Sequence, residues 1–455
     1  MEDSKLTELL VVWLGAVFAV AVFRARRKTA GAGLVLAYLI NLWLIHWVAS
    51  LIYLVPGYVN NDPHLVELGF EQSVYGIVAF AFGSLAFTPF LMSFGLLPRA
   101  SGIHDPDRNL PKAYIAFGVV SYLLMSSALG RAPTAQAIIS TGQELVVVGL
   151  SLACWQAWKE HHTGKLIAWL AISLLMPFAT IVTRGFIGYG AVAAFSVLVF
   201  VSIIVRSRLT VLVVGLVLGY VGLSVYVSYM RDRGEIREVV WGGQPLKDRM
   251  ERVLTTMSTF EWFDPSNRDH LVRVDNRMNQ SFLVGAAVDR LSEVGGYASG
   301  ETLWEAVLAL VPRALWPEKP VTAGSGNVVS QYTGIQFTPG TSIGIGQVME
   351  FYINFGTLGV ILGFLAMGVI VTVLDVQAAE RLAVGDLHGF VLWYLPGISF
   401  LQVGGSLMEV TSSAAASLVV ALLANKYLDR LQTKQAPKSD LSPSSHRLLS
   451  PLRNA

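Results

Sequence analysis

The segment 273–280 (RVDNRMNQ) gathers the side chains best suited to binding a phosphorylated sugar, in a chain that is otherwise largely apolar. It holds two guanidinium groups, one carboxylate and three carboxamides. Arginine pairs with phosphate through two parallel hydrogen bonds, and carboxamides suit the hydroxyl groups of sugars. In one continuous helix Arg273, Arg277 and Gln280 would share a face. These three residues and Asn279 are therefore candidates for binding such a ligand.

A second polar group follows a short amphipathic pattern at 301–310. Such a short pattern cannot span a bilayer, and Trp304 suits the headgroup level, so an interfacial helix is predicted. Pro312 and Pro317 then break the chain into turns. The side chains around these prolines are Arg313, Trp316, Glu318 and Lys319. A glycine-rich run leads on to Glu350, and it is either a flexible return to the membrane or a lid over a polymeric substrate.

Isolated charges beside the apolar runs are a third kind of candidate. Arg184 lies in a tight turn, Thr183-Arg184-Gly185, between two such runs. A lone cation at membrane depth is costly unless it has a partner or faces water, so Arg184 either serves a site or snorkels to lipid headgroups. Glu350 and Glu409 each open an apolar run, where the helix dipole favours an acid, and each could be only a cap. Glu350 is the stronger candidate because it closes the glycine-rich segment.

The elements that must position these residues are membrane helices. The chain is 53% hydrophobic and 14% charged over 455 residues, which is more apolar surface than a soluble core can bury. Its apolar runs are continuous rather than alternating, so a membrane barrel is excluded. We predict an all-α polytopic fold with about eleven transmembrane helices. They lie near residues 7–23, 31–55, 73–96, 113–130, 142–157, 165–182, 186–205, 209–229, 356–374, 388–403 and 409–425.

Basic residues collect in alternate short loops, which predicts that those loops are cytoplasmic. The other loops, and the long polar stretch, would then lie outside. We therefore expect a membrane domain (1–229), an extracytoplasmic loop with short interfacial helices (230–347), a second membrane domain (348–425) and a disordered cytoplasmic tail (426–455). The basic loops contain Arg24, Arg26, Arg27 and Lys28, then Arg99, Arg108 and Lys112, then Lys159 and Lys165, then Arg206 and Arg208, and finally Lys426 and Arg430.

Two patterns that can bind metals in other proteins carry little weight in this sequence. Asp105-Pro106-Asp107 has the spacing of a metal-binding acid pair, but it falls in a predicted cytoplasmic loop beside basic residues. The adjacent His161 and His162 would not face one site on a helix. We expect neither a metal site nor a cofactor. The net charge of +2 gives no reason to expect nucleic acid as a partner.

Taken together, these features resemble the Wzy-type polymerases of bacterial surface polysaccharides, in particular relatives of the enterobacterial common antigen polymerase. The resemblance rests on Thr183-Arg184-Gly185 at the outer end of a span pair, and on residues 312–320 with Leu315-Trp316-Pro317 and Lys319-Pro320. The long outer loop, the glycine-rich return and the flanking spans follow in the matching order. The resemblance covers residues 180–370.

The resemblance implies a metal-independent, lipid-dependent glycosyltransferase of the bacterial inner membrane whose active site faces the periplasm. Such an enzyme transfers a growing chain from undecaprenyl diphosphate to a hydroxyl of the next lipid-linked repeat unit, so its substrate is an undecaprenyl-diphosphate-linked oligosaccharide. Membrane lipids and a polysaccharide chain-length regulator are the expected partners. The related O-antigen ligases use a different acceptor, a lipid A core, and the sequence does not separate the two.

This chemistry assigns roles to the candidate residues. The leaving diphosphate needs fixed cations, and the attacking hydroxyl needs a group that accepts its proton. Glu350 is the first choice for that base, with Asp275, Glu318 and His270 as alternatives. The catalytic candidates are Glu350, Arg313 and Arg277, and the substrate-binding or diphosphate-binding candidates are Arg184, Arg273, Asn279, Gln280, Trp316 and Lys319.

A transporter, such as a flippase for lipid-linked sugars, is the alternative from a different class. Transporters usually place polar groups deep within their spans and show two related halves. The predicted spans of this chain are nearly free of charge, and its polarity is concentrated in one loop. These features favour the polymerase.

The topology gives the first testable prediction. A cysteine introduced at Ser266 should react with a membrane-impermeant thiol reagent in intact spheroplasts, whereas one at Ser439 should not. The native Cys154 lies in a predicted span and should stay unlabelled. Labelling at position 439 with protection at position 266 would show that the predicted orientation is the reverse of the true one.

Overall fold

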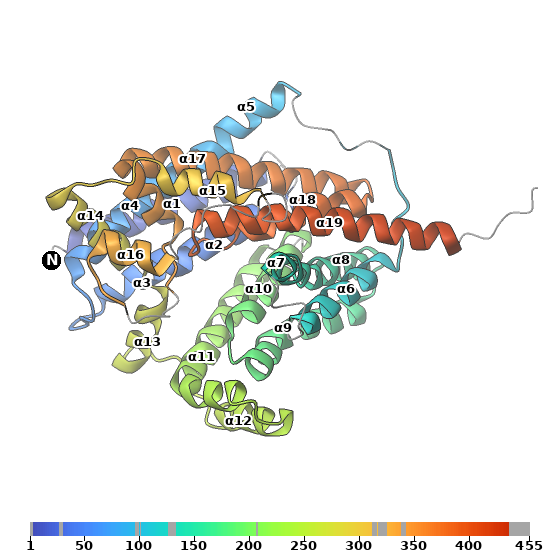
Figure 1. Ribbon diagram of the computed structural model, residues 1–455, viewed down its shortest axis with the longest axis horizontal. Coiled ribbons are helices and arrows are strands. Elements are labelled where there is room, and N and C mark those ends of the chain that lie inside the picture. Colours follow the sequence, from blue (N-terminus) through green and yellow to red (C-terminus); the bar gives the residue numbers. More distant parts are fainter. Residues whose placement is uncertain are drawn as a thin grey trace, which may run out of the picture.

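The computed structural model describes residues 3–26, 31–95, 100, 102–125, 133–205, 208–311, 316, 325–337 and 343–435. Every regular element in these ranges is a helix, and no strand occurs among them (Figure 1). The predicted all-α class is therefore confirmed for the part of the chain that the structure describes.

Eight helical runs are long and apolar enough to cross a membrane. Five of them are single helices: α1 (Asp3–Arg26), α9 (Thr163–Arg184), α11 (Arg208–Trp241), α17 (Gln347–Ala383) and α19 (Leu407–Gln435). The other three are composite: α2 (Leu34–Leu42) with η1 (Trp43–Val48), α3 (Ala49–Leu51) and η2 (Ile52–Leu54); α4 (Pro63–Phe82) with η3 (Gly83–Phe87) and α5 (Thr88–Ser93); and α7 (Pro133–Gly142) with α8 (Leu145–Lys159).

Three further predicted spans correspond to shorter apolar helices. These are α6 (Leu110–Leu124), α10 (Gly188–Ile204) and α18 (Leu387–Phe400). The structure thus supports a multi-pass membrane protein with eight membrane-length helices, and the total of eleven spans stays a prediction. Two helices run past the predicted domain limits: α11 continues beyond residue 229 to Trp241, and α19 continues beyond residue 425 to Gln435. The rest of the predicted tail lies outside the described residues.

Five helices lie between α11 and α17, in the stretch predicted to be the long loop. They are α12 (Leu246–Ser258), α13 (Arg268–Met278), α14 (Gln280–Val294), α15 (Glu301–Ala309) and α16 (Ser325–Thr333). The helix predicted from the pattern at 301–310 is confirmed as α15. Arg273 and Arg277 lie one turn apart on α13, as predicted, but the prediction that Gln280 shares their face is wrong, because α13 ends at Met278 and the non-helical Asn279 caps a new helix by accepting from the Phe282 N–H.

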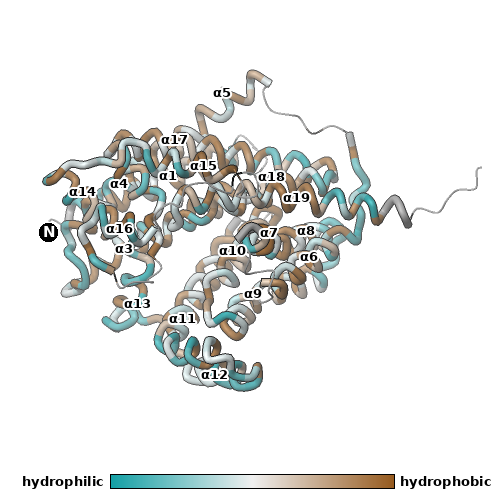
Figure 2. Tube along the Cα trace, in the orientation of Figure 1, coloured by the Kyte–Doolittle hydropathy of each residue, from teal (hydrophilic) through white to brown (hydrophobic). Residues whose placement is uncertain are grey.

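Ten of the long and shorter apolar helices form two groups. In Figure 1, α1, α2, α4, α17, α18 and α19 lie side by side along the long axis, and they pack on one another. The helices α6, α8, α9 and α10 form the second group, which joins the first where α10 meets α2 and α8 meets α18. Apolar residues dominate both groups, while polar residues gather on α12 and α13 (Figure 2).

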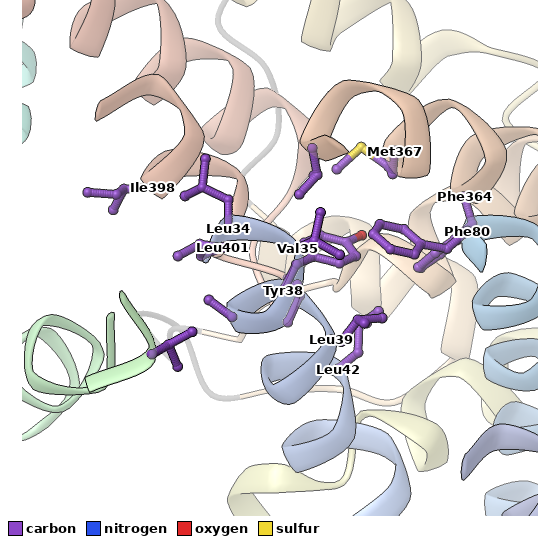
Figure 3. Packing of buried hydrophobic residues seen from close by; sticks show 14 of the residues in the cluster. Leu34, Val35, Tyr38, Leu39, Leu42, Phe80, Phe364, Met367, Ile398 and Leu401 are labelled. Carbon is purple, nitrogen blue, oxygen red and sulfur yellow. The ribbon is translucent and has the colours of Figure 1, made fainter. Parts of the chain in front are cut away.

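The core of the first group is built from stacked aromatic rings and close helix contacts. Tyr38 of α2 stacks on Phe80 of α4 with ring centroids 4.9 Å apart, and Leu34, Leu42 and Met367 pack in the same buried cluster (Figure 3). At the opposite end of α17 from its N-terminus, buried Asp375 pairs with Arg24 and accepts backbone N–H groups at the start of α2. This contact ties α1, α2 and α17 together.

The helix α14 packs directly on α4 through two glycines. A side-chain β-carbon on Gly285 would lie 1.7 Å from the carbonyl oxygen of Leu65, and one on Gly69 would lie 1.9 Å from that of Ser281. Only glycine allows two backbones to approach this closely. The helix α14, in the middle of the predicted loop, is therefore fixed against the membrane-length run that contains α4.

The helix α17 is folded back on itself near its start. Phe355 and Gly356 leave the helical conformation, and Gly356 adopts φ +61° and ψ −151°, which only glycine reaches easily. The ring of Phe351 packs on Gly363, seven residues beyond the kink and thus about 10 Å along the helix axis. The candidate membrane run covers Gln347–Ala383, with the kink near residue 356, where the predicted span begins; Glu350 lies before the kink and does not open the long helix that follows it. Glu350 belongs to a half-helix, residues 347–354, that runs back into the candidate span.

A second break lies beside this half-helix. Residues 401–406 separate α18 from α19, and they pair with the chain that enters α17. The Gly346 N–H donates to the Gly404 carbonyl at 3.1 Å, and the Gln347 N–H donates to the Val403 carbonyl at 3.0 Å. Buried irregular backbone must satisfy its hydrogen bonds within the protein, and these two segments satisfy each other in part.

The contact between α4 and α14 gives the second prediction. Gly285→Ala should force the two helices apart and destabilise the protein by about 1–3 kcal/mol, because overpacking of this kind costs that much. Gly219→Ala is the matched control, since nothing lies within 4 Å of a β-carbon at Gly219 on α11. Thermal unfolding of the purified proteins in detergent measures the difference. Equal unfolding midpoints for the two variants would contradict the close contact.

Candidate functional site

Three arginines from two helices face one another without an acidic partner. Arg233 and Arg237 lie one turn apart on α11, and Arg277 lies in the last turn of α13. Their positive charges repel, since Arg277 acts electrostatically on both of the others. None of the three forms an ion pair with a carboxylate in the described ranges. Uncompensated cations held together in this way favour binding of an anion.

The turn between α9 and α10 holds α11 in place. The Tyr229 hydroxyl donates to the Gly185 carbonyl at 2.9 Å, and the indole N–H of Trp241 donates to the Arg184 carbonyl at 3.2 Å. Between these two contacts, the guanidinium of Arg237 lies 4.1 Å from the centre of the Phe186 ring. This cation–π contact orients the arginine without neutralising its charge.

Arg184 is held in the same turn, next to Gly185 against which Arg237 packs. Its guanidinium lies 4.0 Å from the centre of the Tyr122 ring and donates to Gln143 Oε1 at 2.9 Å. The side chain therefore contacts protein groups rather than extending away along the helix. We call Arg184, Arg233, Arg237 and Arg277 the arginine row.

Arg273, in contrast, belongs to an ionic network. It pairs with Glu261 at 3.3 Å, and Glu261 also accepts from Arg231 at 2.6 Å and from His270 at 3.2 Å. These contacts, that of Arg231 above all, hold the pKa of the Glu261 carboxyl below its usual range. His270 Nδ1 accepts from the Asp264 N–H, so its Nε2 carries the proton that faces Glu261. In this structure Arg273 and His270 bind other protein groups.

Asp275 is buried at the junction of α13 and α14, with 1% of its surface exposed. Its carboxylate accepts five hydrogen bonds, so few lone pairs remain for a substrate proton. Burial and the Asp275 charge together raise the pKa of Tyr58, which keeps that hydroxyl protonated as a donor. The donors are Tyr53 at 2.9 Å, Tyr58 at 3.1 Å, Asn60 at 2.6 Å, Asn61 at 3.1 Å and Asn279 at 2.7 Å.

Glu350 lies in the first turn of the folded-back half-helix, with 2% of its surface exposed. Its Oε2 accepts from the Leu407 N–H at 2.6 Å, at the N-terminus of α19, and Thr302 also hydrogen bonds to the carboxyl. A carboxylate has about four lone-pair positions, so these contacts leave capacity for a further proton. Glu350 is thus a buried carboxyl with no cationic partner among the described residues.

Glu409 has a different role from Glu350. Its Oε2 accepts from the Ser406 N–H at 3.1 Å, while its own N–H donates to Ser406 Oγ at 3.2 Å. This reciprocal pair is a capping box at the start of α19. The interpretation of Glu409 as a helix cap is therefore supported.

The arginine row and Glu350 are joined through a short piece of chain. Arg277 and Gln280 are three residues apart, so at most about 11 Å separates their Cα atoms. Gln280 Nε2 donates weakly to the Gly344 carbonyl at 3.5 Å, and its Oε1 lies beside Gly346. The Glu350 N–H in turn donates to the Gly346 carbonyl at 3.0 Å. Cations and carboxyl thus belong to one continuous region.

The remaining candidates divide between described and undescribed parts of the chain. Trp316 is exposed, at 38% of its surface. Arg313, Glu318 and Lys319 lie outside the described residues. No group of three or more histidine, cysteine, aspartate or glutamate side chains is arranged to hold a metal ion within the described ranges.

Sequence reasoning missed Arg233, Arg237 and Tyr229. The stretch 231–290, which contains both arginines, carries many charges of both signs, and such a composition is typical of an ordinary solvated surface. The available signal was the spacing of 229, 233 and 237, which places one side chain per turn on a single face if the helix of the preceding span continues. Gln347 was missed because nothing in the sequence shows that residues 347–354 fold back.

The fold and site define an all-helical, multi-pass membrane protein with a cluster of arginines that lack carboxylate partners and a buried carboxyl that is linked to this cluster through Gln280. The chain belongs to the family described as "Domain of unknown function (DUF8712)", whose model matches residues 84–433. That range contains the arginine row and Glu350. No curated protein and no solved structure matches the chain.

The arginine row gives the third prediction. Arg233→Gln and Arg237→Gln should each weaken binding of inorganic diphosphate by about tenfold or more, because a hydrogen bond to a charged group contributes roughly 1.5–3 kcal/mol. Isothermal titration of the purified protein measures this. Lys247→Gln, at an exposed position on α12, is the control and should bind diphosphate like the wild type. Equal affinity in all four proteins would show that the row does not bind diphosphate.

Proposed function

We propose that this protein polymerises undecaprenyl-diphosphate-linked oligosaccharide repeat units into a surface polysaccharide. The observation that carries the proposal is the arginine row: Arg233, Arg237 and Arg277 act on one another electrostatically and form no ion pair with a carboxylate among the described residues, and Arg184 lies in the turn against which Arg237 packs. A lipid diphosphate supplies the missing negative charge from within a membrane. The Wzy-like sequence features at Arg184 and at 312–320 support the same reaction class.

The proposed reaction breaks the bond between the anomeric carbon of the donor sugar and the diphosphate oxygen. A hydroxyl oxygen of the acceptor sugar forms the new bond to that carbon, and its proton passes to Glu350. The diphosphate lipid leaves with its charge stabilised by the arginine row, as fixed cations stabilise developing negative charge in other transferases. Glu350 is suited to the base because it is buried, is fixed by Leu407 and Thr302, and lacks a cation that would hold its charge.

Arg273, His270 and Asp275 take supporting roles in this proposal. The first two stabilise the loop that precedes α13 through Glu261, and Asp275 fixes the junction from which Arg277 and Gln280 extend. Arg313 and Lys319 remain candidate cations for the same diphosphate. The proposed protein partner is a polysaccharide chain-length regulator, and a lipid A core, as used by O-antigen ligases, is the alternative acceptor.

One observation favours a transporter as the second candidate. The half-helix 347–354 and the break at 401–406 are discontinuous helices of the kind that line substrate sites in transporters. The two functions differ in product: a polymerase converts lipid-linked repeat units into longer chains, whereas a transporter moves them unchanged. Incubation of purified protein with lipid-linked repeat units, followed by gel separation of the saccharides, distinguishes them.

Glu350 gives the fourth prediction. Glu350→Gln keeps the size of the side chain and the acceptor for Leu407, but cannot take the hydroxyl proton. Polymerisation should fall by about a hundredfold to ten-thousandfold, with normal diphosphate binding. Glu409→Gln is the matched control, because loss of a cap costs only about 1 kcal/mol of stability and should leave the rate nearly unchanged. A Glu350→Gln rate within a few-fold of the wild type would make Glu350 a structural residue.

A further inference from the structure

The N-terminus of the half-helix in α17 is buried and has no side-chain cap. Gly346 stands at the capping position with φ +71°, where any other residue would be strained, and it offers no side-chain acceptor. The first N–H of this half-helix, that of Gln347, pairs with the Val403 carbonyl, so only the N–H groups that follow it in the first turn lack a partner inside the helix. A helix start of this kind, inside a membrane-length segment, suits a ligand that can accept hydrogen bonds.

Two buried side-chain atoms beside this N-terminus have no hydrogen-bond partner in the described structure. One is Nε2 of Gln347, a residue with 1% of its surface exposed; its Oε1 is taken by the Tyr38 hydroxyl. The other is Oε1 of Gln280, which lies beside Gly346. Buried polar atoms are nearly always paired, because an unpaired one costs about 1–3 kcal/mol. An unpaired donor and an unpaired acceptor at one helix start therefore indicate a ligand.

The chemistry of the two atoms identifies the kind of ligand. An anion would be repelled by the amide oxygen of Gln280, and a cation by the amide N–H groups of Gln347 and the helix start. A hydroxyl group fits both, since it accepts one hydrogen bond while donating another. Gln347 and Glu350 are three residues apart on the half-helix, so their side chains lie on the same face.

We infer that Gln280 and Gln347 form a subsite that holds a hydroxyl of the acceptor sugar, adjacent to the hydroxyl that reacts. The inference rests on the proposed function, because it takes Glu350 as the base for the reacting hydroxyl. The two glutamines are positioning residues: they orient the sugar ring and select sugars with a hydroxyl at this place. They do not contact the diphosphate.

The test replaces Gln280 with methionine, which has similar length and no amide. Lipid-linked repeat units are the substrate, and inorganic diphosphate is the separate probe of the arginine row. Gln280→Met should raise the KM for the repeat unit by tenfold or more, leave diphosphate affinity within twofold of the wild type, and leave the unfolding midpoint unchanged or higher. The midpoint should not fall, because an unpaired buried oxygen is removed. Gln244→Met, at the exposed turn before α12, is the control.

A second variant tests Gln347 without leaving the Tyr38 hydroxyl unpaired. The pair Tyr38→Phe with Gln347→Met removes both partners and should show the same raised KM, while Tyr38→Phe alone should retain most of the wild-type KM. Wild-type KM in Gln280→Met and in the double variant, with active polymerisation, would overturn the subsite. A wild-type protein that makes no polymer although it binds diphosphate would instead overturn the proposed function.

Discussion

The buried carboxylate of Asp275 is the interaction on which the site depends. A charge removed from water is tolerated only when hydrogen bonds replace its hydration, and Asp275 receives five of them. Four donors come from the segment between α3 and α4, and the fifth comes from Asn279. The carboxylate thus fastens the junction of α13 and α14 to the end of the second span. The direction in which Arg277 and Gln280 extend follows from this attachment.

Backbone hydrogen bonding imposes the next constraint, because buried backbone groups must find partners within the protein. The chain meets this requirement with two irregular segments that pair with each other, at Gly346 with Gly404 and at Gln347 with Val403. The pairing brings the start of α17 to the break before α19. Glu350 can therefore reach the N-terminus of α19, which it could not do if α17 were straight.

The arginine row and Glu350, the two parts of the proposed site, differ in the charges that surround them. The arginine row keeps cations together with aromatic rings and carbonyl groups as neighbours, so its charge stays available for a diphosphate. Arg273, in contrast, is neutralised by Glu261 and helps to stabilise the loop. Glu350 has no cationic partner among the described residues, which suits the proton acceptor that we propose. The partners that the fold provides thus distinguish the arginines and carboxylates that stabilise the structure from those proposed to bind substrate.

The sequence by itself determined the class of protein, because apolar runs of membrane length and charge-poor composition leave no other way to bury so much apolar surface. It also indicated the α15 helix, Arg184, Arg277 and Glu350 as candidates, since lone charges near apolar runs and guanidinium–carboxamide clusters are unusual. Only the tertiary structure decided which candidates act together. It paired Arg273 with Glu261, placed Arg277 near Arg233 and Arg237, and folded the half-helix that carries Glu350 back into the bundle. These outcomes depend on contacts between residues far apart in the chain, such as Gly285 with Leu65 and Glu350 with Leu407, which no local pattern encodes.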